Sequence, residues 1–194
     1  MADVKIENQK PNIVRIAYHQ EQGDPHYGSC LWAYYDFDLE KYMLNVQSDA
    51  GNAAYRWVAT PDSESFLHLM ARIDDDYLIN KLFAETVVDI EATKRELRKY
   101  LEMADMDDGE IEDAMEGFDN ALDDYDIGRN IGMAYRVVEE WNIDNDLDID
   151  MAYDLVQTDF TAGEKRIVQI FKDYIQPVIR QMIEGTENGE MGYT

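Results

Sequence analysis

The sequence predicts an α+β protein in which an N-terminal antiparallel sheet of three or four strands is followed by a helical C-terminal part. Three observations lead to this class. Segments rich in β-branched and aromatic residues fill the first sixty positions. Beyond Thr60, apolar residues recur at helical spacing. Hydrophobic residues make up 45% of the 194 residues, with 13 Tyr and 3 Trp, so the chain can bury a core that disordered acidic tails lack.

Four segments have the composition or the alternation of strands. The first is rich in β-branched residues, the second in aromatic residues, the third alternates two kinds of side chain, and the fourth carries Tyr55 and Trp57. Turn residues separate them at 23–25 and at 49–52. The four predicted strands are 13–19, 30–37, 42–47 and 53–59.

The aromatic residues of the second strand divide between the two faces of the sheet. Successive strand residues point to opposite sides, so Trp32 and Tyr34 share one face while Tyr35 and Phe37 share the other. One face is expected to pack on the helices. The other face is either further core or a solvent-facing contact surface.

Helices are predicted from Thr60 onward, because Thr60 followed by Pro61 with Glu64 in the first turn is a helix start. A last helix over about 163–184 presents one broad apolar face, and Pro177 should kink it. Between them lie three apolar stripes at helical spacing: Ile90, Leu97, Leu101 and Ala104; Ile111, Met115, Phe118 and Leu122; and Ile127, Ile131, Tyr135 and Val138.

The domain organisation follows from this order of elements. We expect a sheet region over 1–60, a helical region over 61–184 with an acidic segment at 105–154, and a flexible tail over 185–194. No internal repeat and no Ser- or Pro-rich linker divides the chain. A single folded unit is therefore the expectation.

Composition also indicates the compartment. The single cysteine, Cys30, cannot form an internal disulfide, which suits a reducing cytoplasm. The N-terminus has no apolar core segment of a secretory signal, and no uncharged apolar run approaches the roughly 18 residues of a membrane span. We expect a cytoplasmic protein with no membrane partner.

The charge is concentrated in one part of the chain. The sequence has 42 acidic and 17 basic residues, a net charge of −25, and residues 105–154 alone hold 18 acids and 2 bases. This balance repels nucleic acid and attracts basic proteins. A halophilic surface would spread its acid over the whole chain, so the uneven distribution favours a dedicated acidic binding face.

Thirteen carboxylates form the candidate partner-binding site. Ten lie between residues 105 and 124 with no base among them, and a second run follows from 144. A helix over 105–124 would be about 30 Å long, with one charge per ~3 Å, the same order as the one phosphate per ~1.7 Å of duplex DNA. The candidate residues are Asp105, Asp107, Asp108, Glu110, Glu112, Asp113, Glu116, Asp119, Asp123, Asp124, Asp144, Asp146 and Asp148.

The acidic segment must fold against its own repulsion, since like charges at i, i+4 such as Asp108 and Glu112 destabilise a helix by a few tenths of a kcal/mol each. The apolar stripe from Ile111 to Leu122 provides the compensation by docking on the rest of the protein. Such docking would hold the carboxylates on a shaped surface, which mimicry of a nucleic acid requires.

Metal and catalytic sites are weaker interpretations. Asp105, Asp107 and Gly109 imitate the start of a calcium loop, but Glu110 occupies the position of the turn glycine. The stretch from His19 through His26 to Cys30 carries zinc-ligand types without a closed-site spacing, and nothing places Cys30 beside a histidine as a nucleophile pair. We expect no cofactor, no metal and no enzymatic activity.

With its acidic runs 105–124 and 144–154 on a small cytoplasmic chain, the sequence resembles the DNA-mimic inhibitors of bacterial defence, the anti-restriction and anti-CRISPR proteins of phages and mobile elements. The resemblance covers about a quarter of the chain and is compositional. It implies a location in the bacterial host and carboxylates that occupy the cationic groove of a nuclease or Cas effector. These inhibitors share no fold, so the resemblance implies no architecture.

Two other functions remain open at this point. The chain could be an acidic adaptor or chaperone for a basic partner, forming a homodimer through the last helix. It could also be an enzyme or metal protein that uses the region from His19 to Cys30. Neither alternative involves direct contact with nucleic acid.

Overall fold

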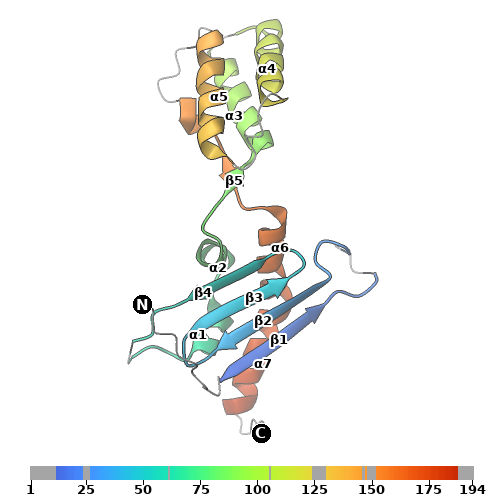
Figure 1. Cartoon of the computed structure of the whole chain (residues 1–194), viewed down its shortest axis with the longest axis vertical. Helices are drawn as coiled ribbons and strands as arrows, with labels where there is room; N and C mark the ends of the chain where they lie inside the picture. Colours follow the sequence, from blue (N-terminus) through green and yellow to red (C-terminus); the bar gives the residue numbers. More distant parts are fainter. Residues whose placement is uncertain are drawn as a thin grey trace, which may run out of the picture. The chain divides into compact units, whose positions relative to one another are not determined.

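The computed structural model describes residues 12–23, 27–60, 62–104, 106–123, 130–145, 147 and 152–187, and it has the predicted α+β architecture (Figure 1). The chain divides into two compact units. Residues 1–84 and 162–194 form the first, here called the sheet unit, and residues 85–161 form the second, the helical unit. The single folded unit expected from the sequence stays a prediction, which hydrogen exchange can test.

The sheet unit contains one antiparallel sheet of four strands in the order β1-β2-β3-β4, which confirms the predicted fold class. Its register aligns Ile16 with Tyr35, Tyr35 with Val46, and Val46 with Ala53. The first strand matches its predicted bounds, and each of the others differs from its predicted bounds by one to three residues at both ends. The strands are β1 (Ile13–His19), β2 (Trp32–Asp38), β3 (Met43–Ser48) and β4 (Asn52–Arg56).

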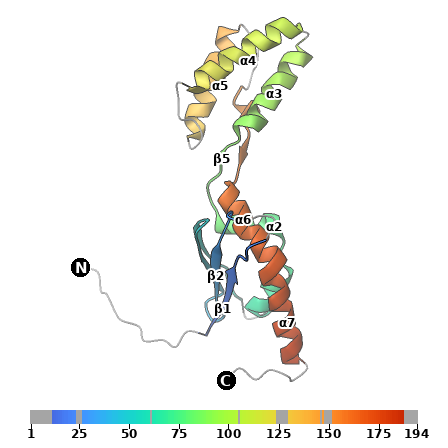
Figure 2. The same ribbon diagram turned by 90° about the vertical axis from the view of Figure 1, so that its right-hand side faces the viewer.

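The two faces of the sheet differ as the alternation predicts. Tyr35 and Phe37 point inward and are fully buried, whereas Trp32 and Tyr34 are half-buried on the opposite face. Seen nearly edge-on, the helices of the sheet unit lie on one side of the sheet (Figure 2). The face that carries Trp32 and Tyr34 therefore has no covering helix from the described part of the sheet unit.

The first helix begins later than the sequence predicts. Thr60 accepts the backbone N–H of Ser63 and so closes a turn, and the helix cap is Ser65, whose side chain accepts the N–H of His68. The predicted start at Thr60 was wrong because a second hydroxyl, five residues on, caps the helix. The helices of the sheet unit are α1 (Phe66–Arg72), α2 (Asp75–Leu82), α6 (Ala162–Ile170) and α7 (Gln176–Glu187).

The predicted disturbance at Pro177 takes the form of a π-helical segment, η2 (Phe171–Ile175), between α6 and α7. The N–H of Gln176 bonds to the carbonyl of Phe171, five residues earlier. Because proline has no N–H and its ring crowds the carbonyl four residues before it, a local change in the hydrogen-bond spacing accommodates Pro177. The helix extends to Glu187, and residues 188–194 of the predicted tail lie outside the described residues.

Among its described residues, the helical unit has three α-helices around an apolar core. Leu97, Leu101, Phe118 and Trp141 lie in this core, which also takes in Val88. On α5 Val138 is buried and Ile131 packs against the core, as the predicted stripe requires, whereas Tyr135 is 40% exposed, so the stripe was wrong at that position. The elements are β5 (Val87–Val88), α3 (Ile90–Met103), α4 (Asp108–Asp123), α5 (Ile131–Asp144), η1 (Ala152–Leu155) and β6 (Thr158–Asp159), and β5 pairs with β6.

Candidate acidic interface

Helix α4 carries the acidic segment, and its apolar stripe fixes it to α3 and α5. Ile111, Met115 and Phe118 are buried, as the sequence predicts for three of the four stripe positions, and Leu122 is half-buried. The Phe118 ring meets Trp141 edge-on at 5.8 Å between centroids. The indole N–H of Trp141 donates to the carbonyl of Ala114 at 2.7 Å. The carboxylates of α4 therefore stand on a folded body.

Two of the candidate carboxylates begin the helix. Asp107 Oδ1 accepts the backbone N–H groups of Gly109 and Glu110 at 2.9 and 3.0 Å. Glu110 in return accepts the backbone N–H of Asp107 at 3.0 Å. This reciprocal arrangement is a capping box, and it places two negative charges at the positive end of the helix dipole. Asp107 is thus committed to backbone N–H groups rather than to a calcium loop.

Helix α3 faces one flank of α4 with basic side chains. Lys94 pairs with Asp119 at 2.6 Å, and Arg98 pairs with Glu112 at 2.9 Å. The hydrogen bond from Arg98 to the Glu112 carboxylate raises the pKa of the guanidinium. A shallow groove of about 410 Å³ runs between the helices and is also lined by Glu91, Arg95, Met115 and Glu116. Two of the acidic charges are therefore balanced within the unit.

Lys94 and Arg98, the basic residues of α3 that pair with α4, are not among the site residues predicted from the sequence. Their signal was present in the sequence, because Lys94 and Arg98 lie four residues apart and are therefore neighbours on one face of a helix, at the border of the stripe formed by Leu97 and Leu101. The sequence alone does not predict that these two basic side chains contact α4. Interhelical pairing depends on tertiary packing rather than on spacing within one segment.

Three candidate carboxylates are exposed on α4 and have neither an ion-pair partner nor a helix-capping hydrogen bond in the described part of the chain: Asp108, Asp113 and Glu116. They follow one another at spacings of five and three residues along the helix. Since the partner-binding role needs unpaired surface charge, these three are the strongest members of the predicted site.

The second predicted run is described only in part. Asp144 is exposed at the end of α5, beside a small hollow of about 120 Å³ that Gly117, Ala121, Val137, Glu140, Trp141 and Asn145 also line. Asp105, Asp124, Asp146 and Asp148 lie outside the described residues, as does the side chain of Asp123, the last residue of α4.

The described members of the alternative site, His19 and Cys30, do not form a reactive pair. Cys30 is 1% exposed, and its thiol donates to the carbonyl of Trp32 at 3.3 Å. Burial, together with the nearby Asp49 carboxylate, raises the pKa of Cys30 to about 11, which opposes a nucleophilic thiolate. His19 is exposed, with its ring 5.8 Å from that of Tyr34. Asp24 and His26 lie outside the described residues.

Among the described residues, no group of three or more His, Cys, Asp or Glu side chains could hold a metal ion. None of the described helices is both long enough and apolar enough to cross a bilayer.

By its fold and its site, the chain is an α+β protein that displays an acidic helix on a small helical unit. It belongs to a phage protein family, Phage_phiTE_072, whose model matches residues 4–181. No curated protein and no solved structure matches the chain.

Proposed function

We propose that this member of a phage family inhibits a DNA-targeting defence protein of its bacterial host, a restriction nuclease or a Cas effector, by placing the carboxylates of α4 in its nucleic-acid groove. The observation that carries the proposal is the set of unpaired, exposed carboxylates Asp108, Asp113 and Glu116 on a helix whose other side is buried. A docked helix presents its charges in a fixed pattern, which a disordered acidic tail does not.

The charge density of α4 supports a phosphate-like role. Its 16 residues include seven acidic ones and span about 24 Å, or one carboxylate per ~3.4 Å, which is the charge spacing along one DNA strand. The pairs with Lys94 and Arg98 balance two of the seven. The remaining five are spaced at about 5 Å on average, so α4 corresponds to a single phosphate row more closely than to a duplex.

We propose binding rather than catalysis. The buried, protonated thiol of Cys30 and the outward position of His19 support this choice, because a nucleophile needs a base within hydrogen-bond reach. Strong opposite charge would steer the acidic unit toward a basic groove and make the association rate salt-dependent.

The test is affinity capture from a bacterial lysate at low salt, with salt elution and mass spectrometry. We expect a nuclease or Cas effector that duplex DNA displaces. The triple variant Asp108→Lys, Asp113→Lys and Glu116→Lys should weaken binding of that protein at least about ten-fold, because each reversal replaces an attraction with a repulsion. Asp107 and Glu112 are left intact, since they cap the helix and pair with Arg98.

A matched control separates this surface from net charge alone. Glu40, Asp62 and Glu184 are exposed acids of the sheet unit, and reversing all three changes the net charge by the same amount. The control variant should retain the affinity of the unaltered protein. Equal weakening by both triple variants would contradict a dedicated α4 surface. A captured partner that DNA does not displace would instead support the adaptor function.

A further inference from the structure

Strand β1 forms an edge of the sheet, because the strand order is β1-β2-β3-β4. The hydrogen bonds that flank it fix which of its residues face β2. The N–H of Gln20 donates to the carbonyl of Leu31 at 2.8 Å, and the N–H of Leu39 donates to the carbonyl of Asn12 at 3.0 Å. In an antiparallel pair, hydrogen-bonded residues alternate, so the even-numbered residues of β1 bond to β2.

The odd-numbered residues of β1 consequently direct their backbone N–H and C=O groups away from the sheet. These residues are Ile13, Arg15, Ala17 and His19. In the described part of the chain no backbone group pairs with them. Their carbonyls and amides form a regular row along the free edge.

This edge lacks most of the usual protections against strand pairing. The seven residues of β1 pair one-to-one with β2, so no bulge twists the edge away. The strand contains no proline and no lysine, and its one fully charged side chain, Arg15, is paired with Asp36 of β2. Its inward positions, Val14, Ile16 and Tyr18, carry no charge. Natural edge strands that must stay unpaired commonly carry at least one of these devices.

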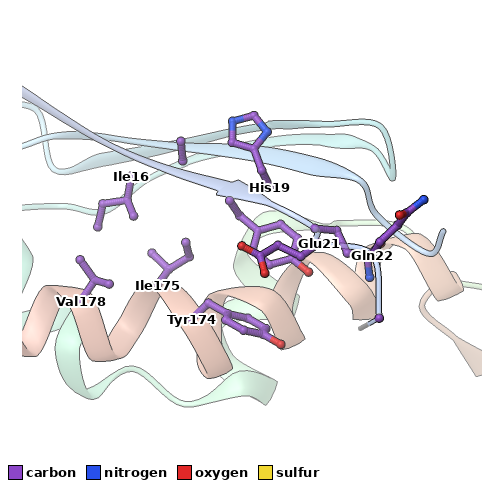
Figure 3. A pocket seen from close by; sticks show the side chains of 11 residues that line it. Ile16, His19, Glu21, Gln22, Tyr174, Ile175 and Val178 are labelled. Carbon is purple, nitrogen blue, oxygen red and sulfur yellow. The ribbon is translucent and has the colours of Figure 1, made fainter. Parts of the chain in front are cut away.

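A groove of about 740 Å³ runs beside the free edge, between β1 and the helix formed by η2 and α7 (Figure 3). Ile16 on the strand faces Ile175 and Val178 on the helix (Figure 3). Two of the lining side chains are exposed although largely apolar, Tyr174 at 45% and Val178 at 38%. Exposed apolar side chains beside an unpaired strand edge indicate a surface that a further strand would cover.

We propose that a second copy of this chain pairs with β1 in antiparallel fashion, with Ile16 opposite Ile16 of the other copy. The two four-stranded sheets would then form one continuous sheet across a two-fold axis. Ile13 would lie opposite His19, and Arg15 opposite Ala17, so that every outward backbone group of β1 has a partner. This pairing supplies roughly eight backbone hydrogen bonds.

The register follows from strand length and charge. Ile16 is the midpoint of Ile13–His19, so this register alone pairs the whole strand. Moving the centre to Arg15 would place two guanidinium groups directly opposite each other, which is destabilising. In the chosen register the inward side chains Ile16 from both copies meet beside the apolar groove, where Val178 and Tyr174 become covered.

Local charge disfavours a basic segment as the occupant of this edge. Although the chain has a net charge of −25, β1 carries Arg15 and no carboxylate. Of the described residues that line the groove, the only carboxylate is Glu21, past the end of the strand. A basic peptide would therefore meet little opposite charge here, whereas in a second copy paired in the Ile16 register each Arg15 lies opposite Ala17 and not opposite another charge.

The first test is the mass of the purified full chain by sedimentation equilibrium over a range of concentrations. We expect a reversible dimer of the 22.5 kDa chain. Ala17→Pro removes an outward N–H that β2 does not use, and it should weaken dimerisation at least about ten-fold while circular dichroism stays unchanged. Ala17→Thr keeps the N–H and should dimerise as the unaltered protein does.

The second test examines the register by disulfide trapping. Ile16→Cys should form a cross-linked dimer under mild oxidation, because the two cysteines would be directly opposite each other. Ala17→Cys should cross-link poorly, since its opposite residue is Arg15. Cys30 contributes little background, being buried.

A chain that stays monomeric throughout would overturn the proposal, as would a dimer that Ala17→Pro leaves unchanged. Cross-linking through position 17 but not 16 would overturn the register. A monomer that binds an added extended peptide at β1 would replace the second copy with another occupant. None of these measurements involves the α4 surface, so the proposed inhibitory function can fail or hold separately.

Discussion

The sheet unit and the helical unit are stabilised by different kinds of contact. In the sheet unit, buried polar side chains connect segments that are far apart in the sequence. The Tyr35 hydroxyl donates to the carbonyl of Ile167 at 2.7 Å, and the amide of Gln176 donates to the carbonyls of Met70 and Ile73. In the helical unit such bonds also occur, from Trp141 to the carbonyl of Ala114 and from the N–H of Gln157 to Thr93, but the buried side chains that hold its helices together are chiefly apolar and include Phe118.

The distribution of charge follows this difference. Residues 85–161 hold 24 acidic and 6 basic residues, a net charge of −18, while the rest of the chain has a net charge of −7. The stability of an apolar core does not depend on the sign of the charges on the surface around it. The comparison therefore teaches that the helical unit can carry a dense acidic face because its core is formed without ionised groups.

The largest effect should come from opening the helical core. Phe118→Ala removes a fully buried ring and should lower the free energy of unfolding by about 3–5 kcal/mol. Hydrogen exchange should show lost protection in α3, α4 and α5 but not in β2 and β3. Phe171→Ala, in the sheet unit, is the matched control and should instead lower the protection of β2 and β3 from hydrogen exchange. Equal loss in both units after either change would show that the chain unfolds as one cooperative body.

A smaller effect should follow from breaking a buried polar contact of the sheet unit. Gln176 is 1% exposed, and Gln176→Leu leaves the carbonyls of Met70 and Ile73 without their donor. The cost should be about 1–3 kcal/mol, measured by urea unfolding. Arg180→Met removes an exposed donor to the carbonyl of Ala71 and should cost less. A Gln176→Leu protein of unchanged stability would contradict the role given to buried polar contacts.

Loss of the α4 cap should cost about 1 kcal/mol. Asp107→Ala leaves the N–H groups of Gly109 and Glu110 without their acceptor and removes a charge that favours the helix dipole. Asp107→Asn keeps a capping oxygen and should recover most of the stability. Thermal unfolding of both variants makes the measurement. Equal losses in the two would mean that charge, rather than the hydrogen bonds, stabilises this end of the helix.

The smallest effects should be of opposite sign for two acids of α4. Asp119→Asn removes the partner of Lys94 and should destabilise by ~0.2–1 kcal/mol. Asp113 lies three residues from both Glu110 and Glu116, so Asp113→Asn relieves repulsion and should stabilise by a few tenths of a kcal/mol. Urea midpoints at low and high salt provide the test, and salt should shrink both changes. The same sign for both would contradict the separation of paired from unpaired carboxylates.

Much of the fold could be predicted because its signals are local. The alternation of Tyr35 and Phe37 against Trp32 and Tyr34 depends only on the two-residue repeat of a strand, and the structure confirms it. The docking stripe of α4 depends only on helical spacing and is confirmed at Ile111, Met115 and Phe118. The first helix start failed because Thr60 and Ser65 are both good caps, and packing of Phe66 selects between them.

The sequence by itself determined the order of sheet and helices, the concentration of acid in the middle of the chain and the apolar stripe that lets α4 fold. Only the tertiary structure decided which carboxylates are paired, because Lys94 and Arg98 reach Asp119 and Glu112 across a helix–helix contact. It also decided that residues 162–187 return to the sheet, which leaves one edge of β1 beside an apolar groove. Both outcomes depend on contacts between segments distant in the sequence, and the spacing of residues within one segment does not predict such contacts.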